Sequence, residues 1–277
     1  MARILVIEDN PVNMKLAALL LHNAGHTVLR AVDAETGLAL ARADLPDLVL
    51  MDFQLPGMDG SAATTLLKQD PATATIPVIA LTAMPMKSAR EKGLLVGCEA
   101  YVAKPLHYQE LYAAIDTLLA KEEQQAGAGL PEAASSLPTH DASVQTAVAR
   151  TVDVSILAGL VGNDPTVILE FLDDFRVSAA KIARDLTTAC LDRQASQAGK
   201  QAHKLKSSAH TVGATTLGGL CTEMETAGKA GRTETLLALL PRFERELEAV
   251  NACLDALLAP PASTVTTHNA KERCDAG

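Results

Sequence analysis

The chain contains no tryptophan, and only four phenylalanines and three tyrosines occur among its 277 residues. Lysine and arginine form no basic run, and the formal net charge is −9. Proteins that bind nucleic acids use basic surfaces, and those that bind single strands add aromatic side chains on which bases stack. Neither feature is present, so we expect no nucleic-acid partner.

Cysteine is also scarce and gives no recognisable pattern. The five cysteines are Cys98, Cys190, Cys221, Cys253 and Cys274. They are odd in number and far apart, and no CxxC motif or Cys/His pair at zinc spacing occurs. This excludes a disulfide framework and a structural zinc site, and indicates reduced thiols.

Long hydrophobic runs are missing as well. No run approaches the about 20 apolar residues that a transmembrane helix needs, and Met1-Ala2 leads directly into a predicted strand rather than a secretory signal. We therefore expect a cytoplasmic protein with no membrane partner. At 277 residues the chain is long enough for one large or two modest domains, and with 48% apolar and 21% charged residues each half can bury a core.

Four short apolar runs in the N-terminal part each lead to a reactive polar side chain. They are Arg3–Ile7 before Glu8 and Asp9, Asp47–Asp52 ending at Asp52 itself, Pro77–Leu81 before Thr82, and Ala100–Ala103 before Lys104. Apolar runs without alternation predict strands buried on both faces of a parallel sheet. Open α/β sheets bind ligands at the carboxyl ends of such strands.

Helical patterns alternate with these strands. Helices are predicted at Val12–Ala24, Ala34–Ala43, Ser61–Lys68, Met86–Val96 and His107–Ala120, and a further strand at Thr27–Leu29. Five βα units predict a doubly wound, flavodoxin-like, five-stranded parallel sheet. With strand order 2-1-3-4-5, the first and third strands flank the crevice, so the carboxylates of Glu8, Asp9 and Asp52 are expected to converge there.

The rest of the chain predicts a second, all-α domain. Residues 122–151 have no apolar period and are rich in small residues, which is typical of a flexible linker. Asp164-Pro165 marks a helix start, and further helices are predicted at Arg193–Thr211, Thr215–Ala230 and Thr233–Leu258. Residues 152–259 thus predict a four-helix bundle with a short N-terminal helix, followed by a disordered tail at 260–277.

One helix of this bundle has two distinct faces. At about 100° per residue, Ala198, Ala202, Leu205 and Ala209 form an apolar seam, whereas His203, Lys206 and His210 lie on another face. This predicts a partly exposed His203 imidazole with an ammonium group one turn away. A lone helical histidine is more commonly a surface residue or a hydrogen-bonded core residue, and a metal site lacks a third ligand.

The motifs resemble two known families. Residues 1–121 resemble the receiver domain of two-component response regulators, through Glu8-Asp9, MDFQLPGMDG around Asp52, IPVIALTAM around Thr82 and AYVAKPL around Lys104. Residues 152–259 resemble histidine phosphotransfer (HPt) domains through AHKLKSSAHTVGA, which contains His203. Within this motif, Ser207 departs from the glycine that is usual in that family.

The receiver resemblance implies that Asp52 accepts a phosphoryl group from a phosphohistidine with the help of Mg²⁺. The implied metal ligands are Glu8, Asp9, Asp52 and the backbone carbonyl of Gln54, and oxygen ligands suit this hard cation. Thr82 and Lys104 are expected to bind the phosphoryl oxygens, and Thr82 and Tyr101 to form a conformational switch.

The HPt resemblance implies that His203 is a second phosphoacceptor and that Lys206 offsets the charge of its phosphoryl group. Together the two resemblances imply a bacterial two-component phosphorelay protein rather than an enzyme with a kinase core. Its expected partners are a sensor or hybrid histidine kinase and a downstream response regulator, and we expect a monomer. Exchange between Asp52 and His203 within one chain is a hypothesis.

Two alternatives stay open. An aspartate-nucleophile phosphatase also uses an aspartate with Mg²⁺, but such enzymes carry DxDxT, whereas position 54 is Gln here. An interaction adaptor that is gated by phosphorylation, with an inactive HPt domain, is the stronger alternative because of Ser207.

Overall fold

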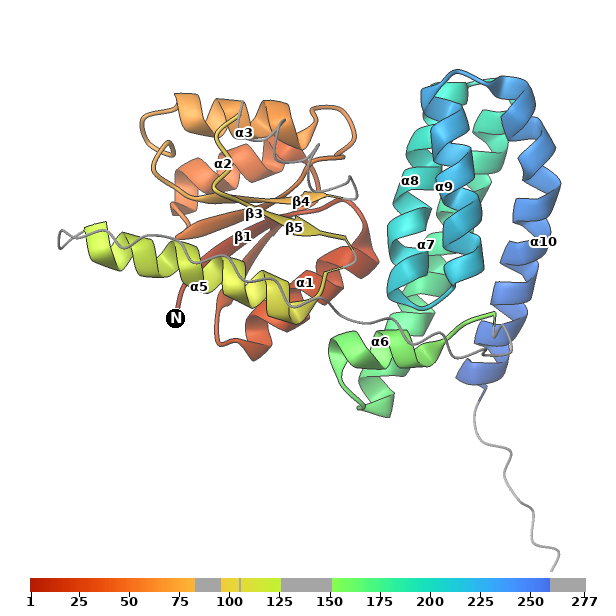
Figure 1. Ribbon diagram of the computed structural model, residues 1–277, viewed down its shortest axis with the longest axis horizontal. Helices are drawn as coiled ribbons and strands as arrows, with labels where there is room; N and C mark the ends of the chain where they lie inside the picture. The colour runs from red at the N-terminus through yellow and green to blue at the C-terminus, as the bar shows by residue number, and fades with distance from the viewer. Residues whose placement is uncertain (83–95, 105, 126–150, 260–277) are drawn as a thin grey trace, which may run out of the picture.

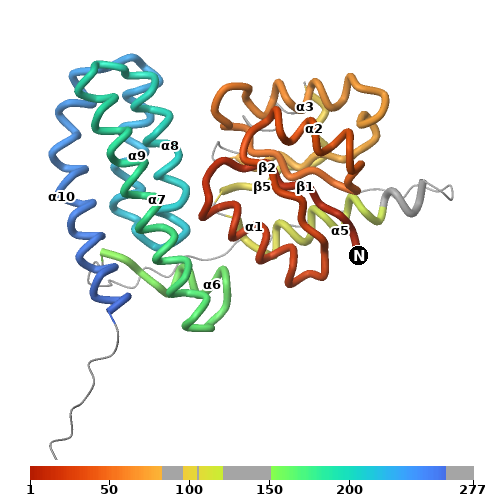
Figure 2. Tube along the Cα trace, turned by 180° about the vertical axis from the view of Figure 1, so that it is seen from behind, coloured from red at the N-terminus to blue at the C-terminus, as the bar shows by residue number. Residues whose placement is uncertain are grey.

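A computed structural model describes residues 1–82, 96–104, 106–125 and 151–259. They form an α/β domain and a helical bundle that lie side by side (Figures 1 and 2). The predicted helix Met86–Val96 lies almost wholly outside the described residues, as do most of the predicted linker and the predicted tail. Among the residues described, no single helix is long and apolar enough to cross a membrane, although the bent pair of helices Val154–Val161 and Pro165–Leu191 meets that test jointly.

The α/β domain is built on the parallel sheet that the sequence predicts. Its strands are β1 (Arg3–Ile7), β2 (Thr27–Ala31), β3 (Leu48–Asp52), β4 (Val78–Thr82) and β5 (Ala100–Ala103). They are ordered β2-β1-β3-β4-β5. The register pairs Ile7 with Met51 and Asp52 with Leu81. The carboxyl ends of β1, β3 and β4 therefore meet at one edge.

Helices cover both faces of this sheet, which explains the unbroken apolar strands. The helices are α1 (Pro11–Asn23), α2 (Ala34–Asp44), α3 (Gly60–Gln69) and α5 (Tyr108–Gln125). The α1 and α5 helices lie on one face, and α2 and α3 on the other (Figure 1). Accordingly, Ile4 and Val6 of β1 belong to one apolar cluster, and Leu5 and Ile7 to the other.

The C-terminal domain is the predicted four-helix bundle with a short preceding helix. Its elements are α6 (Val154–Val161), α7 (Pro165–Leu191), α8 (Ala195–Thr211), α9 (Thr215–Lys229) and α10 (Thr233–Leu258). Asp164 caps α7 by accepting a hydrogen bond from the Thr166 amide, with Pro165 in the first turn, as its sequence predicts. The seam residues Ala198, Ala202 and Leu205 are fully buried.

Two glycines let α8 and α9 pack closely. A Cβ atom added at Gly228 of α9 would lie only 2.5 Å from the Cα of Gly199 of α8. Because neither residue has a side chain, the two backbones come into direct contact. This approach places the α9 side chains one turn from Gly228 against the face of α8 that carries His203.

The cysteines agree with the predicted absence of a disulfide framework within the described residues. Cys98, Cys190, Cys221 and Cys253 are all free thiols. Burial raises the pKa of Cys98 and of Cys190 to about 11, so these thiols remain protonated at neutral pH. Cys274 lies outside the described residues.

Candidate functional site

Three carboxylates converge at the carboxyl edge of the sheet. Glu8 and Asp9 follow β1, and Asp52 ends the neighbouring strand β3. One oxygen atom from each lies within 4.8 Å of those of the other two. The side chains of Glu8 and Asp52 are almost completely buried. The strand order thus brings together the acidic residues that the sequence singled out.

Lys104, which follows β5, neutralises part of this cluster. Its Nζ contacts Glu8 Oε2 and lies 2.8 Å from Asp52 Oδ2. Burial lowers the pKa of the ammonium, but the two carboxylates outweigh burial, and the net shift is upward. Burial also raises the pKa of Glu8 to about 7, because Lys104 offsets only part of the desolvation. One lysine therefore does not balance the cluster.

The geometry of the carboxylates fits a hard divalent cation. Opposite oxygen ligands of Mg²⁺ are about 4 Å apart when each bond is 2.0–2.1 Å long, which is compatible with the separation of the three oxygens. The backbone amide of Gln54 donates a hydrogen bond to Asp52 Oδ1 at 2.9 Å, so the Gln54 backbone lies beside the cluster.

Thr82 and Tyr101 lie on the neighbouring strands. Thr82 ends β4 and is buried, which places its hydroxyl group at the same edge of the sheet as the carboxylates. Tyr101 of β5 is half-buried, and its hydroxyl donates a hydrogen bond to the carbonyl oxygen of Cys98 at 3.4 Å. Thr82 thus lies at the same edge of the sheet as the cluster, whereas the tyrosine hydroxyl contacts the turn at Cys98.

A second charged cluster lies on the bundle. The Nδ1 atom of His203 is 3.1 Å from Glu225 Oε1, and Lys206 Nζ is 2.6 Å from Glu225 Oε2. Lys229 also contacts Glu225 from one turn further along α9. Burial raises the pKa of the Glu225 carboxyl, but hydrogen bonds from these three side chains outweigh burial, and the pKa lies well below its usual range. Glu225 is therefore a carboxylate at neutral pH.

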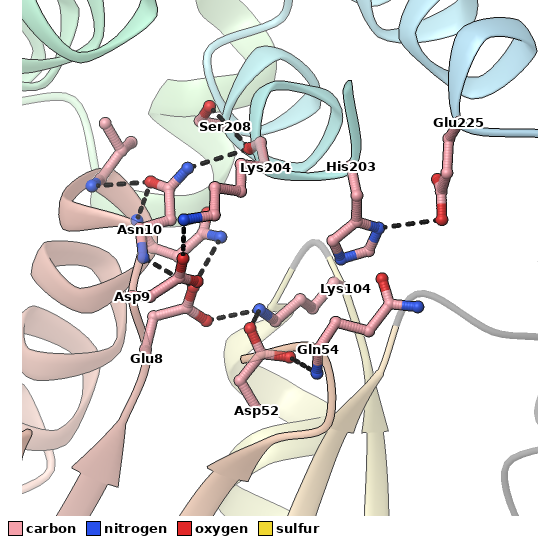
Figure 3. A network of polar contacts seen from close by, with 12 residues as sticks. Glu8, Asp9, Asn10, Asp52, Gln54, Lys104, His203, Lys204, Ser208 and Glu225 are labelled. Carbon is pink, nitrogen blue, oxygen red and sulfur yellow. Dashed lines mark hydrogen bonds and ion pairs between the residues drawn. The ribbon is translucent and has the colours of Figure 1, made fainter. Parts of the chain in front are cut away.

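Sequence reasoning assigned no role to Glu225, and its expectation for His203 was wrong. The imidazole is not partly exposed; His203 retains only 7% of its accessible surface. Glu225 covers its Nδ1 side, and the other ring nitrogen is directed toward the α/β domain (Figure 3). The spacing of residues along α8 does not indicate that Glu225 or the α/β domain lies next to His203.

Replacing Glu225 with Gln should destabilise the bundle by about 2–3 kcal/mol at pH 7, because three donors lose a charged acceptor. The folded pKa of Glu225 lies below its ordinary value of 4.5, so its contribution is complete above that pH and is lost as the pH falls toward the folded pKa. Urea unfolding at pH 7 and pH 3 should show the difference between wild type and variant shrinking in acid.

The matched control for that measurement is Glu223→Gln on the same helix. Glu223 is about half exposed, and its ion pair with Arg242 is 3.7 Å long. Its loss should change stability by less than about 0.5 kcal/mol. Equal effects of the two substitutions would contradict a special role for the Glu225 carboxylate.

The two clusters face each other because the domains are in contact. Lys15 of α1 lies 2.6 Å from Asp174 Oδ2 and 3.3 Å from Glu170 Oε2 of α7. Its Nζ also lies 4.9 Å from the centroid of the Phe171 ring. Near the acidic cluster, Asn10 Nδ2 donates a hydrogen bond to the carbonyl oxygen of Lys204 at 2.9 Å.

A cavity of about 390 Å³ lies between the loop after β3 and the helix α8. Gln54 lines one side, and His203 and Lys229 line the other. Figure 3 shows the ring nitrogen of His203 that does not contact Glu225 on the side facing Asp52 and Lys104. The arrangement therefore turns an imidazole nitrogen toward the edge of the sheet that carries the carboxylate cluster, and the cavity itself is lined by Gln54 and the loop that follows Asp52.

Comparisons with known proteins match each domain separately. The response regulator receiver domain model matches residues 4–116, and the Hpt domain model matches residues 170–258. Protein PilH of Pseudomonas aeruginosa is 39% identical over 120 residues, which are 43% of this chain and 99% of PilH. The polar-differentiation response regulator DivK of Brucella anthropi is 40% identical over 116 residues, which are 42% of this chain and 94% of DivK.

Among solved structures, the receiver domain of a Pseudomonas aeruginosa sensor histidine kinase, with a magnesium ion in its active-site cleft, is 33% identical. The match covers 43% of this chain and 98% of that chain, with a TM-score of 0.41. PilH and DivK are matched over nearly their whole length by the α/β domain, and the bundle matches the Hpt model. The chain thus belongs to the response regulator receiver family and carries, in the same polypeptide, an Hpt domain of two-component phosphorelay.

Proposed function

We propose that Asp52 accepts a phosphoryl group from the phosphohistidine of a sensor or hybrid histidine kinase and exchanges it with His203 of the same chain. The observation that carries this proposal is the closed contact between the domains, in which a ring nitrogen of His203 is on the side facing Asp52 and Lys104 (Figure 3) and Lys204, the next residue, forms an ion pair with Asp9. Receiver and Hpt domains are phosphotransfer modules rather than kinase cores, so they interact with histidine kinases and with other response regulators.

The residues of the receiver site have complementary roles in this proposal. An Asp52 oxygen attacks the phosphorus atom while the bond to the donor imidazole breaks, and the bonding electrons return to that nitrogen. Lys104 and Thr82 stabilise the charge on the equatorial oxygens, because phosphoryl transfer depends on positioning and electrostatics. Glu8, Asp9, Asp52 and the Gln54 carbonyl would hold Mg²⁺, which supplies further positive charge when bound.

His203 is prepared for the second step by Glu225. An ionised carboxylate only accepts hydrogen bonds, so Nδ1 of His203 is the protonated nitrogen and donates to Glu225. The lone pair of Nε2 is then available to attack the phosphorus atom on Asp52, and the electrons of the broken bond return to the aspartate oxygen. Lys206, already beside Glu225, supplies a positive charge next to the new phosphoryl group.

Phosphorylation of Asp52 is proposed to draw Thr82 toward the phosphoryl oxygens and to release Tyr101 from Cys98. We retain residues 1–121 and 152–259 as the two domains; α5 continues past the first limit to Gln125. We further propose that the protein is a cytoplasmic monomer. A downstream response regulator is the proposed acceptor of phosphoryl groups from His203.

The exchange within one chain is tested by reversing the charge of Lys15. A Lys15→Glu chain places a third carboxylate beside Glu170 and Asp174, which should open the contact between α1 and α7. We expect the conversion of base-labile aspartyl phosphate to acid-labile histidyl phosphate to slow about tenfold. In wild type, this rate should not depend on protein concentration.

Two variants complete this experiment. Adding Asp174→Lys to Lys15→Glu restores an opposite-charge pair and should restore much of the rate. Arg245→Glu makes the same charge reversal on the exposed surface of α10, away from the receiver (Figure 1), and should leave the rate unchanged. A wild-type rate that rises in proportion to protein concentration would show that transfer occurs between chains instead.

A further inference from the structure

The residue that follows His203 reaches into the acidic cluster of the other domain. Lys204 Nζ lies 2.5 Å from Asp9 Oδ2. The Lys204 side chain is 25% exposed and that of Asp9 is 7% exposed, so the ion pair is largely shielded from solvent. The Lys204 backbone is held as well, since its carbonyl oxygen accepts the hydrogen bond from Asn10.

Lys204 balances a charge that Lys104 does not reach. Lys104 forms ion pairs with Glu8 and Asp52, whereas the ion pair of Asp9 among the described residues is with Lys204. Three clustered carboxylates are therefore matched by two ammonium groups, one from each domain. Asp9 is also one of the three carboxylates positioned to hold a divalent cation.

We propose that the Lys204 ammonium neutralises Asp9 when the two domains are in contact, so that Mg²⁺ binding and the contact of α8 with the receiver weaken each other. This inference rests on the proposed metal site and adds a coupling between that site and the HPt domain. The ammonium and the metal are positive charges that would share one carboxylate, and their repulsion is weakly screened in a shielded site.

The coupling acts in both directions. If the Lys204–Asp9 ion pair lowers the affinity of the cluster for Mg²⁺, then bound Mg²⁺ weakens that ion pair by the same factor. Because Lys204 is adjacent to His203, metal binding at the receiver also weakens the contact between the receiver and the turn of α8 that carries His203.

The test is a magnesium chloride titration of the full-length protein, followed by NMR amide shifts at the carboxyl ends of β1 and β3. Lys204→Met removes the ammonium but keeps most of the side-chain volume, and it should bind Mg²⁺ about 5–10-fold more tightly than wild type. Lys204→Arg keeps the charge and should resemble wild type. The amide spectrum of each variant establishes that it is folded.

Lys200→Met is the matched control. Lys200 is exposed on the same helix and lines the same cavity, and the substitution makes the same change in net charge. Its Mg²⁺ affinity should stay within about twofold of wild type, because exposed charges are screened by salt.

Three outcomes would overturn the inference. An unchanged or weaker Mg²⁺ affinity of Lys204→Met would show that the lysine does not compete with the metal. An equal gain in Mg²⁺ affinity in Lys200→Met would show that the effect comes from the net charge alone. Absence of Mg²⁺ binding in every variant would remove the metal site itself and the coupling with it, whereas phosphoryl transfer to His203 is measured separately and can succeed or fail independently.

Discussion

Replacing Lys104 with Met should lower the free energy of unfolding of the receiver domain by about 3–5 kcal/mol. The ammonium is almost completely buried and contacts both Glu8 and Asp52. Removing it leaves two carboxylates close together with no shared cation in a site that excludes water. Urea unfolding of the full chain, followed by NMR signals of the sheet, measures this loss.

The same substitution should reduce phosphoryl transfer to Asp52 by about 10²–10³-fold, since one preorganised positive charge is lost from the phosphoryl oxygens. Added Mg²⁺ should restore more stability to the variant than to wild type, because it binds the folded cluster whose charge is no longer balanced.

Arg42→Met is the control for this pair of effects. Arg42 forms an exposed ion pair with Asp70 in the same domain, and such pairs contribute about 0–1 kcal/mol. If Lys104→Met unfolds at the same urea concentration as Arg42→Met, the ion pairs of Lys104 do not stabilise the cluster.

His203→Gln should abolish labelling of the bundle and leave labelling of Asp52 intact. Gln keeps a polar side chain of similar reach but has no nitrogen able to carry a phosphoryl group. Asp52→Asn should remove label from both sites when a histidine kinase that recognises only the receiver is the donor. Acid and base lability of the bound label distinguishes histidyl from aspartyl phosphate.

These two variants also discriminate between the relay and the adaptor. If wild type carries no histidyl phosphate while His203→Gln accepts label on Asp52 normally, internal relay is wrong and the adaptor with an inactive HPt domain is favoured. Label on His203 in the Asp52→Asn chain would show that the kinase phosphorylates the bundle directly.

The sequence predicts the parts of the fold that depend on local pattern. The β1 and β3 strands are identifiable because burial on both faces requires unbroken apolar residues, and α7 begins where Asp164 and Pro165 predict it. The convergence of Glu8, Asp9 and Asp52 follows from strand order alone, because neighbouring parallel strands end at the same edge.

The contacts between elements cannot be predicted in this way. Glu225 reaches His203 because Gly199 and Gly228 let α8 and α9 approach closely, but a glycine within a helical pattern does not by itself indicate which helix packs against it. Lys204 meets Asp9 only because the two domains are in contact. For the same reason the exposure of His203 was mispredicted, since its covering comes from residues distant in sequence.

Asn10 has two hydrogen-bonding roles at once, and few other side chains can fill both. Its side-chain oxygen accepts hydrogen bonds from the Val12 and Asn13 amides at the start of α1, while its amide nitrogen donates to Lys204. Asp would serve the helix start equally well, but an aspartate has no donor for the Lys204 carbonyl. In lineages that lose the HPt domain, this asparagine should therefore be free to change to aspartate; where the fused pair persists, it should not.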